Sequence, residues 1–243
     1  MHSLKNKIIL ITGANRGIGK SLIKASLEKG AKKVYATCRD LSKMSKFEDG
    51  RVITLKLDIT QEAEIKKVAS QTTDTQILIN NAGVLSAGSI LNGAITSIEK
   101  DMNVNYYGTI KMMQSFAPIL ESNTPARMVN ITSIVAYSPL PSIAGYSASK
   151  AALLSATYSA RIELAKKGVT VHAVNPGAID TDMNKGSDWD MPSSDSVAKV
   201  ILDKIEQEEL DIIPEDIGIE MFSAWKDDPK KLADMFHKLY HGE

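Results

Sequence analysis

Short runs of branched apolar residues alternate along the chain with longer segments in which apolar residues recur at helical intervals. The short runs span 7–11, 33–38, 52–56, 76–80, 126–131 and 169–174. The longer segments predict helices over 19–29, 62–70, 94–120 and 146–167, and Gly30 and Gly168 follow two of them as helix-stop signals. Such alternation, with strands nearly continuous in Ile, Leu and Val, is typical of a parallel sheet covered by helices on both faces. The pattern therefore predicts an α/β fold with a doubly wound parallel sheet in three α/β/α layers.

The regular alternation ends after Pro176. Residues 184–192 form a polar stretch that contains Trp189 and predicts a loop or short lid. Residues 221–239 carry apolar residues at roughly helical intervals. Core packing is the favoured interpretation of these residues, and a position over a ligand cleft or at a subunit contact is the alternative. No linker or repeat interrupts the 243 residues, so we expect a single Rossmann-like domain.

Composition narrows the class of protein. Acidic and basic residues balance at 29 each, and no stripe of Lys and Arg is interleaved with aromatic residues, so neither nucleic acid nor a membrane is an expected partner. No apolar run reaches the length of a membrane span, and residues 1–7 lead into a short strand without the apolar core of a signal peptide. Cys38 is the only cysteine, no histidine cluster suggests a metal, and His172 is interpreted as a core residue. We expect a cytoplasmic protein without a metal.

A glycine-rich turn joins the first predicted strand to the first predicted helix. Its sequence, TGANRGIG over 12–19, places glycines at Gly13, Gly17 and Gly19. Backbone amides at a helix N-terminus can face a pyrophosphate, and glycine lets such a ligand approach closely. The G-x-x-x-G-x-G spacing differs from the common dinucleotide fingerprint, and the glycines alone could mark only a tight turn. A nucleotide-binding loop is the favoured interpretation.

Two arginines bear on which nucleotide this loop would bind. A dinucleotide site usually places an acid on the adenosine ribose, or a base on its 2′-phosphate, about twenty residues beyond the glycines. Arg39 stands directly after the second predicted strand, and Arg16 stands inside the glycine loop. Two cations near one extra phosphate favour NADP(H) over NAD(H). Asp40 leaves an alternative open, because it could take the ribose hydroxyls or neutralise Arg39.

Tyr146 and Lys150 are four residues apart in a predicted helix, so their side chains share one face. Taken alone, they could be an ordinary exposed pair. A free tyrosine has a pKa near ~10, so proton exchange at neutral pH requires a lowering worth about 4 kcal/mol, much of which a partly desolvated lysine could supply. The pair predicts acid–base chemistry by Tyr146.

Together these motifs resemble the short-chain dehydrogenase/reductase superfamily in its single-domain form. The resemblance covers about 5–181. It rests on motifs in family order, namely the glycine loop, Asp58, the segment 80–83, Asn105, Ser133, Tyr146 with Lys150, and Pro176 and Gly177 followed by Thr181.

The resemblance implies a catalytic set of Asn105, Ser133, Tyr146 and Lys150. Tyr146 would be the general acid when a carbonyl is reduced and the general base when an alcohol is oxidised. Lys150 would lower the pKa of Tyr146 and bind the nicotinamide ribose. Ser133 would donate a hydrogen bond to the substrate oxygen, and Asn105 would complete a water relay to Lys150.

The resemblance also implies a dinucleotide site. Asp58 and Ile59 would border the adenine, 81–83 the adenosine ribose, and 176–181 the nicotinamide. The expected cofactor-binding residues are Gly13, Asn15, Arg16, Gly17, Ile18, Gly19, Arg39, Asp58, Ile59, Asn81, Ala82, Gly83, Tyr146, Lys150, Pro176, Gly177, Ile179 and Thr181. We expect a cofactor half at about 1–125 and a catalytic and substrate half at about 126–243.

These expectations combine into an oxidoreductase that transfers hydride between NADP(H) and a small-to-medium apolar carbonyl or alcohol substrate. The substrate walls are expected at 84–91, 134–146 and 178–189. Their apolar members are Val84, Leu85, Ile134, Val135, Tyr137, Leu140 and Trp189. The alternatives are an NADP(H)-binding sensor with little turnover, and an epimerase or dehydratase that uses the same Tyr–Lys pair.

The expected assembly is a homodimer or homotetramer. Helices 94–120 and 146–167 could pair across a twofold axis, where small residues permit close approach. These residues are Ala148, Ala151, Ala152 and Ala156. The C-terminal region lacks the paired-glycine strand with which many relatives support a tetramer.

Overall fold

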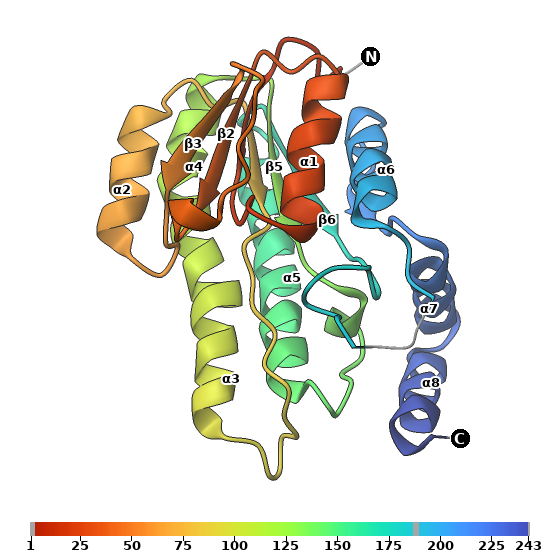
Figure 1. Ribbon diagram of the computed structural model, residues 1–243. Helices are drawn as coiled ribbons and strands as arrows, with labels where there is room; N and C mark the ends of the chain where they lie inside the picture. The colour runs from red at the N-terminus through yellow and green to blue at the C-terminus, as the bar shows by residue number, and fades with distance from the viewer. Residues whose placement is uncertain (1–2, 187–189, 243) are drawn as a thin grey trace.

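The computed structural model describes residues 3–186 and 190–242, and its centre is one seven-stranded parallel sheet (Figure 1). The strand order is β3-β2-β1-β4-β5-β6-β7. The strands are β1 Ile8–Ile11, β2 Lys33–Cys38, β3 Val52–Lys56, β4 Ile77–Asn80, β5 Ala126–Ile131, β6 Val169–Val174 and β7 Asp211–Ile212. The chain runs outward from β1 to β3 and then returns to the other side of β1 at β4, so the sheet is doubly wound as predicted.

Helices cover both faces of this sheet and complete the three predicted layers (Figure 1). They are α1 Gly17–Glu28, α2 Glu62–Gln71, α3 Ile95–Asp101, α4 Thr109–Ser122, α5 Ala144–Leu164, α6 Ser194–Glu206, α7 Asp216–Asp227 and α8 Pro229–His241. One apolar core joins α1 and α6 to the sheet through Leu22 and Ile201. A second core joins α2 and α4 to the opposite face through Ile65 and Phe116. Strands β1, β2, β4, β5 and β6 are therefore buried on both sides, whereas the edge strand β3 is partly exposed.

The predicted helix over 94–120 consists of α3, a π-helical segment at Met102–Gly108, and α4. A π-helical turn is rare and often marks a functional site. Asn105, predicted to be catalytic, lies in this segment.

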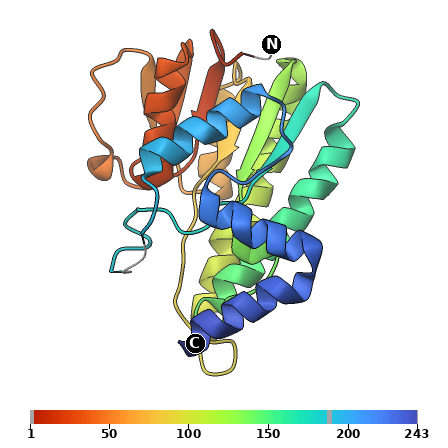
Figure 2. The same cartoon turned by 90° about the vertical axis from the view of Figure 1, so that its right-hand side faces the viewer.

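The C-terminal region holds elements that the sequence pattern did not resolve. Strand β7 has only two residues, and α6 was not expected. Both views place α7 and α8 beyond the carboxyl ends of the strands (Figures 1 and 2). Leu232 and Phe236 of α8 form a third apolar cluster with Ile134, Val135 and Tyr146. Across the described ranges, no helix combines the length and the apolar character needed to cross a bilayer.

Candidate active site

A cavity of about 1210 Å³ runs along the carboxyl ends of the strands. All predicted site residues line it except Asn105 and Gly19. The glycine loop bounds one end, and α7 and α8 bound the other. The cavity thus lies where an open α/β sheet normally binds its ligand, with β1 and β4 on either side of the topological switch point.

The glycine loop is held in contact with the segment that follows β4. Gly13 has φ +65°, and a Cβ there would lie 2.7 Å from the Cα of Ala82. Thr12 Oγ1 accepts hydrogen bonds from the amides of Asn81 and Ala82, both at 3.0 Å. Helix α1 begins directly after this loop, and no side chain caps its N-terminus. Its first amides are therefore available to an anion in the cavity.

Gly19, predicted to bind the cofactor, does not itself line the cavity but packs directly behind the glycine loop. A Cβ at Gly19 would collide with the carbonyl oxygen of Gly13 and would lie 2.5 Å from Nδ2 of Asn81. Asn81 Nδ2 itself donates to the backbone oxygens of Thr12 and Gly13. Gly19 is needed so that α1 can pack against the loop.

Basic side chains gather at the glycine-loop end of the cavity. Arg16, Arg39 and Lys43 all line it, and Arg39 forms no ion pair with any residue that the structure describes. Asp40 does not neutralise Arg39, because its carboxylate accepts from the amide and hydroxyl of Ser42 at 3.0 and 2.7 Å. Lys43 Nζ lies 3.9 Å from Asp40 Oδ2. Lys43 was missed in the sequence because a lone surface lysine carries no signal.

Asp58 lines the same end of the cavity and shapes its own turn. Its Oδ1 accepts from the amide and hydroxyl of Thr60 at 2.9 and 2.7 Å. The carboxylate therefore orders the loop after β3 through hydrogen bonds to its neighbour.

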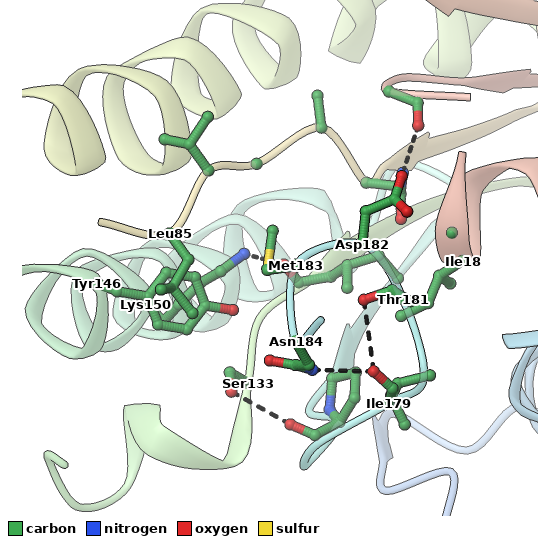
Figure 3. A pocket seen from close by; sticks show the side chains of 18 of the residues that line it. Ile18, Leu85, Ser133, Tyr146, Lys150, Ile179, Thr181, Asp182, Met183 and Asn184 are labelled. Carbon is green, nitrogen blue, oxygen red and sulfur yellow. Dashed lines mark hydrogen bonds between the residues drawn. The ribbon is translucent and has the colours of Figure 1, made fainter. Parts of the chain in front are cut away.

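Ser133, Tyr146 and Lys150 lie close together in the lining of the cavity (Figure 3). Ser133 follows β5, whereas Tyr146 and Lys150 lie one turn apart on α5. Lys150 Nζ donates to the carbonyl oxygen of Ile131 at 2.7 Å and lies 5.6 Å from the centroid of the Tyr146 ring. Ser133 Oγ donates to the carbonyl oxygen of Pro176 at 3.2 Å. The structure thus brings together a phenol, an ammonium and a hydroxyl.

Burial controls the protonation of this pair. It raises the pKa of Tyr146 to about 12, with a partial offset from the hydrogen bond with Ser133. It lowers the pKa of Lys150 to about 8, although the nearby Asp101 opposes this. In the chain alone the pKa of Tyr146 is thus raised and not lowered, because desolvation of the phenolate dominates while Lys150 Nζ donates to the carbonyl oxygen of Ile131.

Asn105 is fully buried in the π-helical segment and does not line the cavity. Its Oδ1 accepts from the amide of Val84, and its Nδ2 donates to the carbonyl oxygen of Val84, both at 2.8 Å. Nδ2 also donates to Ser149 Oγ at 2.9 Å. The side chain fixes the segment after β4 against α5, beside Tyr146 and Lys150.

The far end of the cavity is apolar. The predicted wall residues Val84, Leu85, Ile134, Val135 and Leu140 line it. Tyr137 does not; its ring packs against Phe222 and Trp225, with centroids at 5.1 and 4.6 Å. Trp189 lies outside the described residues.

The C-terminal helices add a wall to this apolar end. Their lining residues are Ile217, Met221, Phe236, Leu239 and Tyr240. The apolar periodicity over 221–239 thus corresponds both to core packing and to a position over the cleft. Among the described residues, no group of acidic, histidine and cysteine side chains could hold a metal ion.

Comparisons with known proteins agree with this geometry. A family model described as short chain dehydrogenase matches residues 7–191. An uncharacterized oxidoreductase of Staphylococcus saprophyticus is 32% identical over 200 residues, which cover 78% of this chain and 85% of that protein. An NADPH-dependent 1-acyldihydroxyacetone phosphate reductase of Schizosaccharomyces pombe is 36% identical over 181 residues, which cover 72% of this chain but only 60% of that protein.

Solved structures give the same result. A short-chain dehydrogenase from Burkholderia cenocepacia, crystallised in complex with NADP, has a TM-score of 0.92 and 34% identity, covering 96% of this chain and 98% of that one. A short-chain dehydrogenase/reductase from Burkholderia phymatum in complex with NAD shares the fold, with a TM-score of 0.84, 20% identity, and coverage of 95% of this chain and 96% of that one. Because the family model spans more than half of the sequence, this chain belongs to the short-chain dehydrogenase/reductase family of oxidoreductases.

Proposed function

We propose that this protein is an NADP(H)-dependent oxidoreductase that interconverts a small-to-medium apolar carbonyl compound and its alcohol, with Tyr146 as general acid and base. The observation that carries the proposal is the position of Ser133, Tyr146 and Lys150. They lie between a glycine-loop end with three cations and an apolar end. A dinucleotide that extends from the glycine loop along the cavity would place its nicotinamide end beside Ser133, Tyr146 and Lys150. The apolar walls next to these side chains would then receive the substrate.

The cavity residues fit a dinucleotide. At Gly13 the backbone leaves no room for a side chain, and a Cβ at Gly17 would lie 3.2 Å from Thr181 Cγ2. The loop and the 176–181 segment therefore approach each other closely, as two sides of a ligand cradle. In this proposal 1–125 supply the adenosine and pyrophosphate contacts, and 126–243 supply the catalytic residues and most of the substrate walls.

The three cations support NADP(H) over NAD(H). A 2′-phosphate near Arg39 would gain charge-assisted hydrogen bonds, with Lys43 and Arg16 adding further positive charge. Arg16 is shared with Asp182, at 3.4 Å, so its charge is only partly available. The names of two relatives, an NADPH-dependent reductase and an NADP complex, agree with this assignment.

The chemistry follows from the positions of the side chains. When bound along this cavity, NADPH would be the source of the hydride that reaches the carbonyl carbon. As that C–H bond forms and the carbon–oxygen π bond breaks, Tyr146 donates its phenolic proton to the developing alkoxide. Ser133 donates a hydrogen bond to the same oxygen, and Lys150, with a pKa of about 8, stabilises the phenolate and returns a proton to it. Alcohol oxidation uses the same groups in reverse.

Asn105 contributes to this site by fixing the backbone beside it. Its side-chain hydrogen bonds to Val84 and Ser149 hold it in the buried π-helical turn, from which it would complete the proposed water relay to Lys150.

The proposal includes a homodimer or homotetramer built on α5. Its outer face exposes Ala148, Ala151, Ser155 and Ile162, the last at 79% of its surface. Tyr107, in the π-helical segment that contacts α5, is 53% exposed. Small residues around two large apolar ones suit close helix pairing. Light scattering that gives a monomer at micromolar concentration would contradict this assembly.

The function is tested by following NADPH oxidation with a panel of aldehydes, ketones, diketones and quinones. Turnover with apolar members, and a preference for NADPH over NADH, are expected. Tight NADPH binding without turnover of any compound would favour a sensor, and purified protein that retains NAD would favour an epimerase.

A further inference from the structure

A single peptide unit, between Pro176 and Gly177, is held at both ends by buried polar groups. Its N–H, on Gly177, donates to Glu215 Oε1 at 2.6 Å. Its C=O, on Pro176, accepts from the Ile134 amide at 2.9 Å and from Ser133 Oγ at 3.2 Å. An acidic side chain and the proposed catalytic serine therefore bind opposite ends of the same peptide.

Glu215 is built into this position. It is 7% exposed and stands directly before α7, where its Oε2 accepts from the amide of Gly218 at 2.6 Å. A Cβ at Gly177 would lie 2.8 Å from Oε1, and one at Gly218 would collide with the same atom. Burial raises the pKa of Glu215, while the hydrogen bonds from backbone amides oppose this shift. Two glycines and two short hydrogen bonds thus surround one buried carboxyl group.

This carboxylate does more than cap a helix. Asp228, which caps α8, accepts a hydrogen bond from the amide two residues further on. Glu215 binds the first turn of its own helix and also reaches back 38 residues to Gly177. Gly177 lines the cavity, and Ile217, in the first turn of α7, lines it as well. The side chain therefore joins the turn beside Ser133 to the helix that covers the apolar end.

We infer that Glu215 is a positioning residue for the reaction: it holds the Pro176–Gly177 peptide, and through it Ser133, in register with Tyr146 and the start of α7. Glu215 fixes the peptide at its N–H, and the Pro176 carbonyl in turn fixes the backbone next to Ser133 through the Ile134 amide. The single hydroxyl proton of Ser133 leaves the Pro176 carbonyl for the developing alkoxide when substrate binds. Loss of the carboxylate frees the peptide to rotate, which displaces the serine hydroxyl from the geometry that the developing alkoxide requires. The inference rests on the proposed function.

The test compares Glu215→Gln and Gly218→Ala with the matched control Asp216→Asn. Glutamine keeps the size of Glu215, but its side-chain NH₂ group would face one of the two backbone N–H donors, on Gly177 or Gly218, and could not accept a hydrogen bond from it. Gly218→Ala keeps the charge and favours the helix, but its Cβ displaces the carboxylate. Asp216 is the exposed acidic neighbour in the same helical turn. The probe is 9,10-phenanthrenequinone, an apolar dicarbonyl, with NADPH or NADPH deuterated at both C4 positions.

Glu215→Gln and Gly218→Ala are expected to lower kcat by about 10- to 100-fold, the loss that follows from misplacing a catalytic group by about 1 Å. The dissociation constant of NADPH should stay within about 3-fold, and the deuterium isotope effect on kcat should rise because hydride transfer has become slower. Asp216→Asn should stay within about 2-fold of the wild type.

A purely structural role gives a different pattern. A smaller folded fraction lowers the rate but leaves the isotope effect unchanged. An unchanged isotope effect in both variants, or a kcat equal to that of Asp216→Asn, would overturn the inference. Absence of turnover by the wild type with every compound of the panel would instead contradict the proposed function, and the inference with it.

Discussion

Replacement of Arg39 by Ala tests the choice of cofactor at a single side chain. Arg39 follows β2, lines the glycine-loop end of the cavity, and forms no ion pair within the described part of the chain. Its charge is therefore available to a ligand. Arg16 and Lys43, by contrast, already lie near Asp182 and Asp40 at 3.4 and 3.9 Å. We expect Arg39 to contribute most of the discrimination between NADPH and NADH.

The magnitude follows from the type of contact. A hydrogen bond to a charged group is worth about 1.5–3 kcal/mol, and about 1.4 kcal/mol corresponds to a tenfold change in affinity. Arg39 is exposed, so salt screens part of this interaction. Arg39→Ala should therefore weaken NADPH binding by about 10- to 30-fold in 0.1 M salt, and Lys43→Ala by about 2- to 5-fold. NADH, without the 2′-phosphate, should lose less than about 2-fold.

The assay is a fluorescence titration of both cofactors at two salt concentrations. Lys20→Ala is the matched control, because Lys20 is an exposed cation on α1 that does not line the cavity. Asp40→Asn tests the alternative role of the neighbouring acid as a ligand of the ribose. An equal loss of NADPH and NADH affinity in Arg39→Ala, or a large loss of NADH affinity in Asp40→Asn, would refute the reasoning.

Two further predictions concern the glycine loop and the core. Gly19→Ala should weaken NADPH binding by more than about 10-fold, although Gly19 does not line the cavity, because the added Cβ would displace Gly13 and Asn81. The control is Gly50→Ala, whose Cβ meets nothing within 4 Å, and equal NADPH affinities of the two variants would contradict the packing role of Gly19. Burial lowers the pKa of His172 to about 4 from 6.5, so between these pH values the unfolded state binds more protons than the folded state. Acidification from pH 7 to pH 4 should therefore lower the free energy of unfolding of the wild type by up to about 3 kcal/mol more than that of His172→Gln. Urea unfolding at a series of pH values, with the exposed His237→Gln as control, measures this difference, and parallel losses in wild type and His172→Gln would show that His172 is not responsible.

The sheet could be predicted from the sequence because its evidence is local. Parallel strands covered on both faces are rich in apolar residues, and six such runs coincide with β1–β6 to within one residue, although β3 lies at the sheet edge and is partly exposed. Strand β7 has only two residues and begins at Asp211, so no apolar run marks it. Helix α6 did carry a signal, namely Ser193 as N-cap and apolar residues three and four apart, which the loop-like sequence before it obscured.

Site residues that belong to sequence motifs could be predicted, whereas residues whose role depends on tertiary packing could not. Ser133, Tyr146 and Lys150 lie close together, because Ser133 follows the carboxyl end of β5 and the first turns of α5 pack beside it. Glu215 was missed because its partner Gly177 is 38 residues away and no periodicity links the two. Tyr137 was predicted to line the substrate wall from its sequence position, but its ring instead packs against Phe222 and Trp225 of α7.

The most direct test of the central claim is NADPH oxidation by wild type and Tyr146→Phe, measured side by side with the apolar carbonyl that the wild type reduces fastest. Removal of the proton donor should lower kcat by at least about 100-fold, the range for loss of a general acid. NADPH affinity should change by less than about 3-fold, because the ring and its packing remain. Turnover by Tyr146→Phe at a rate near that of the wild type would contradict the account.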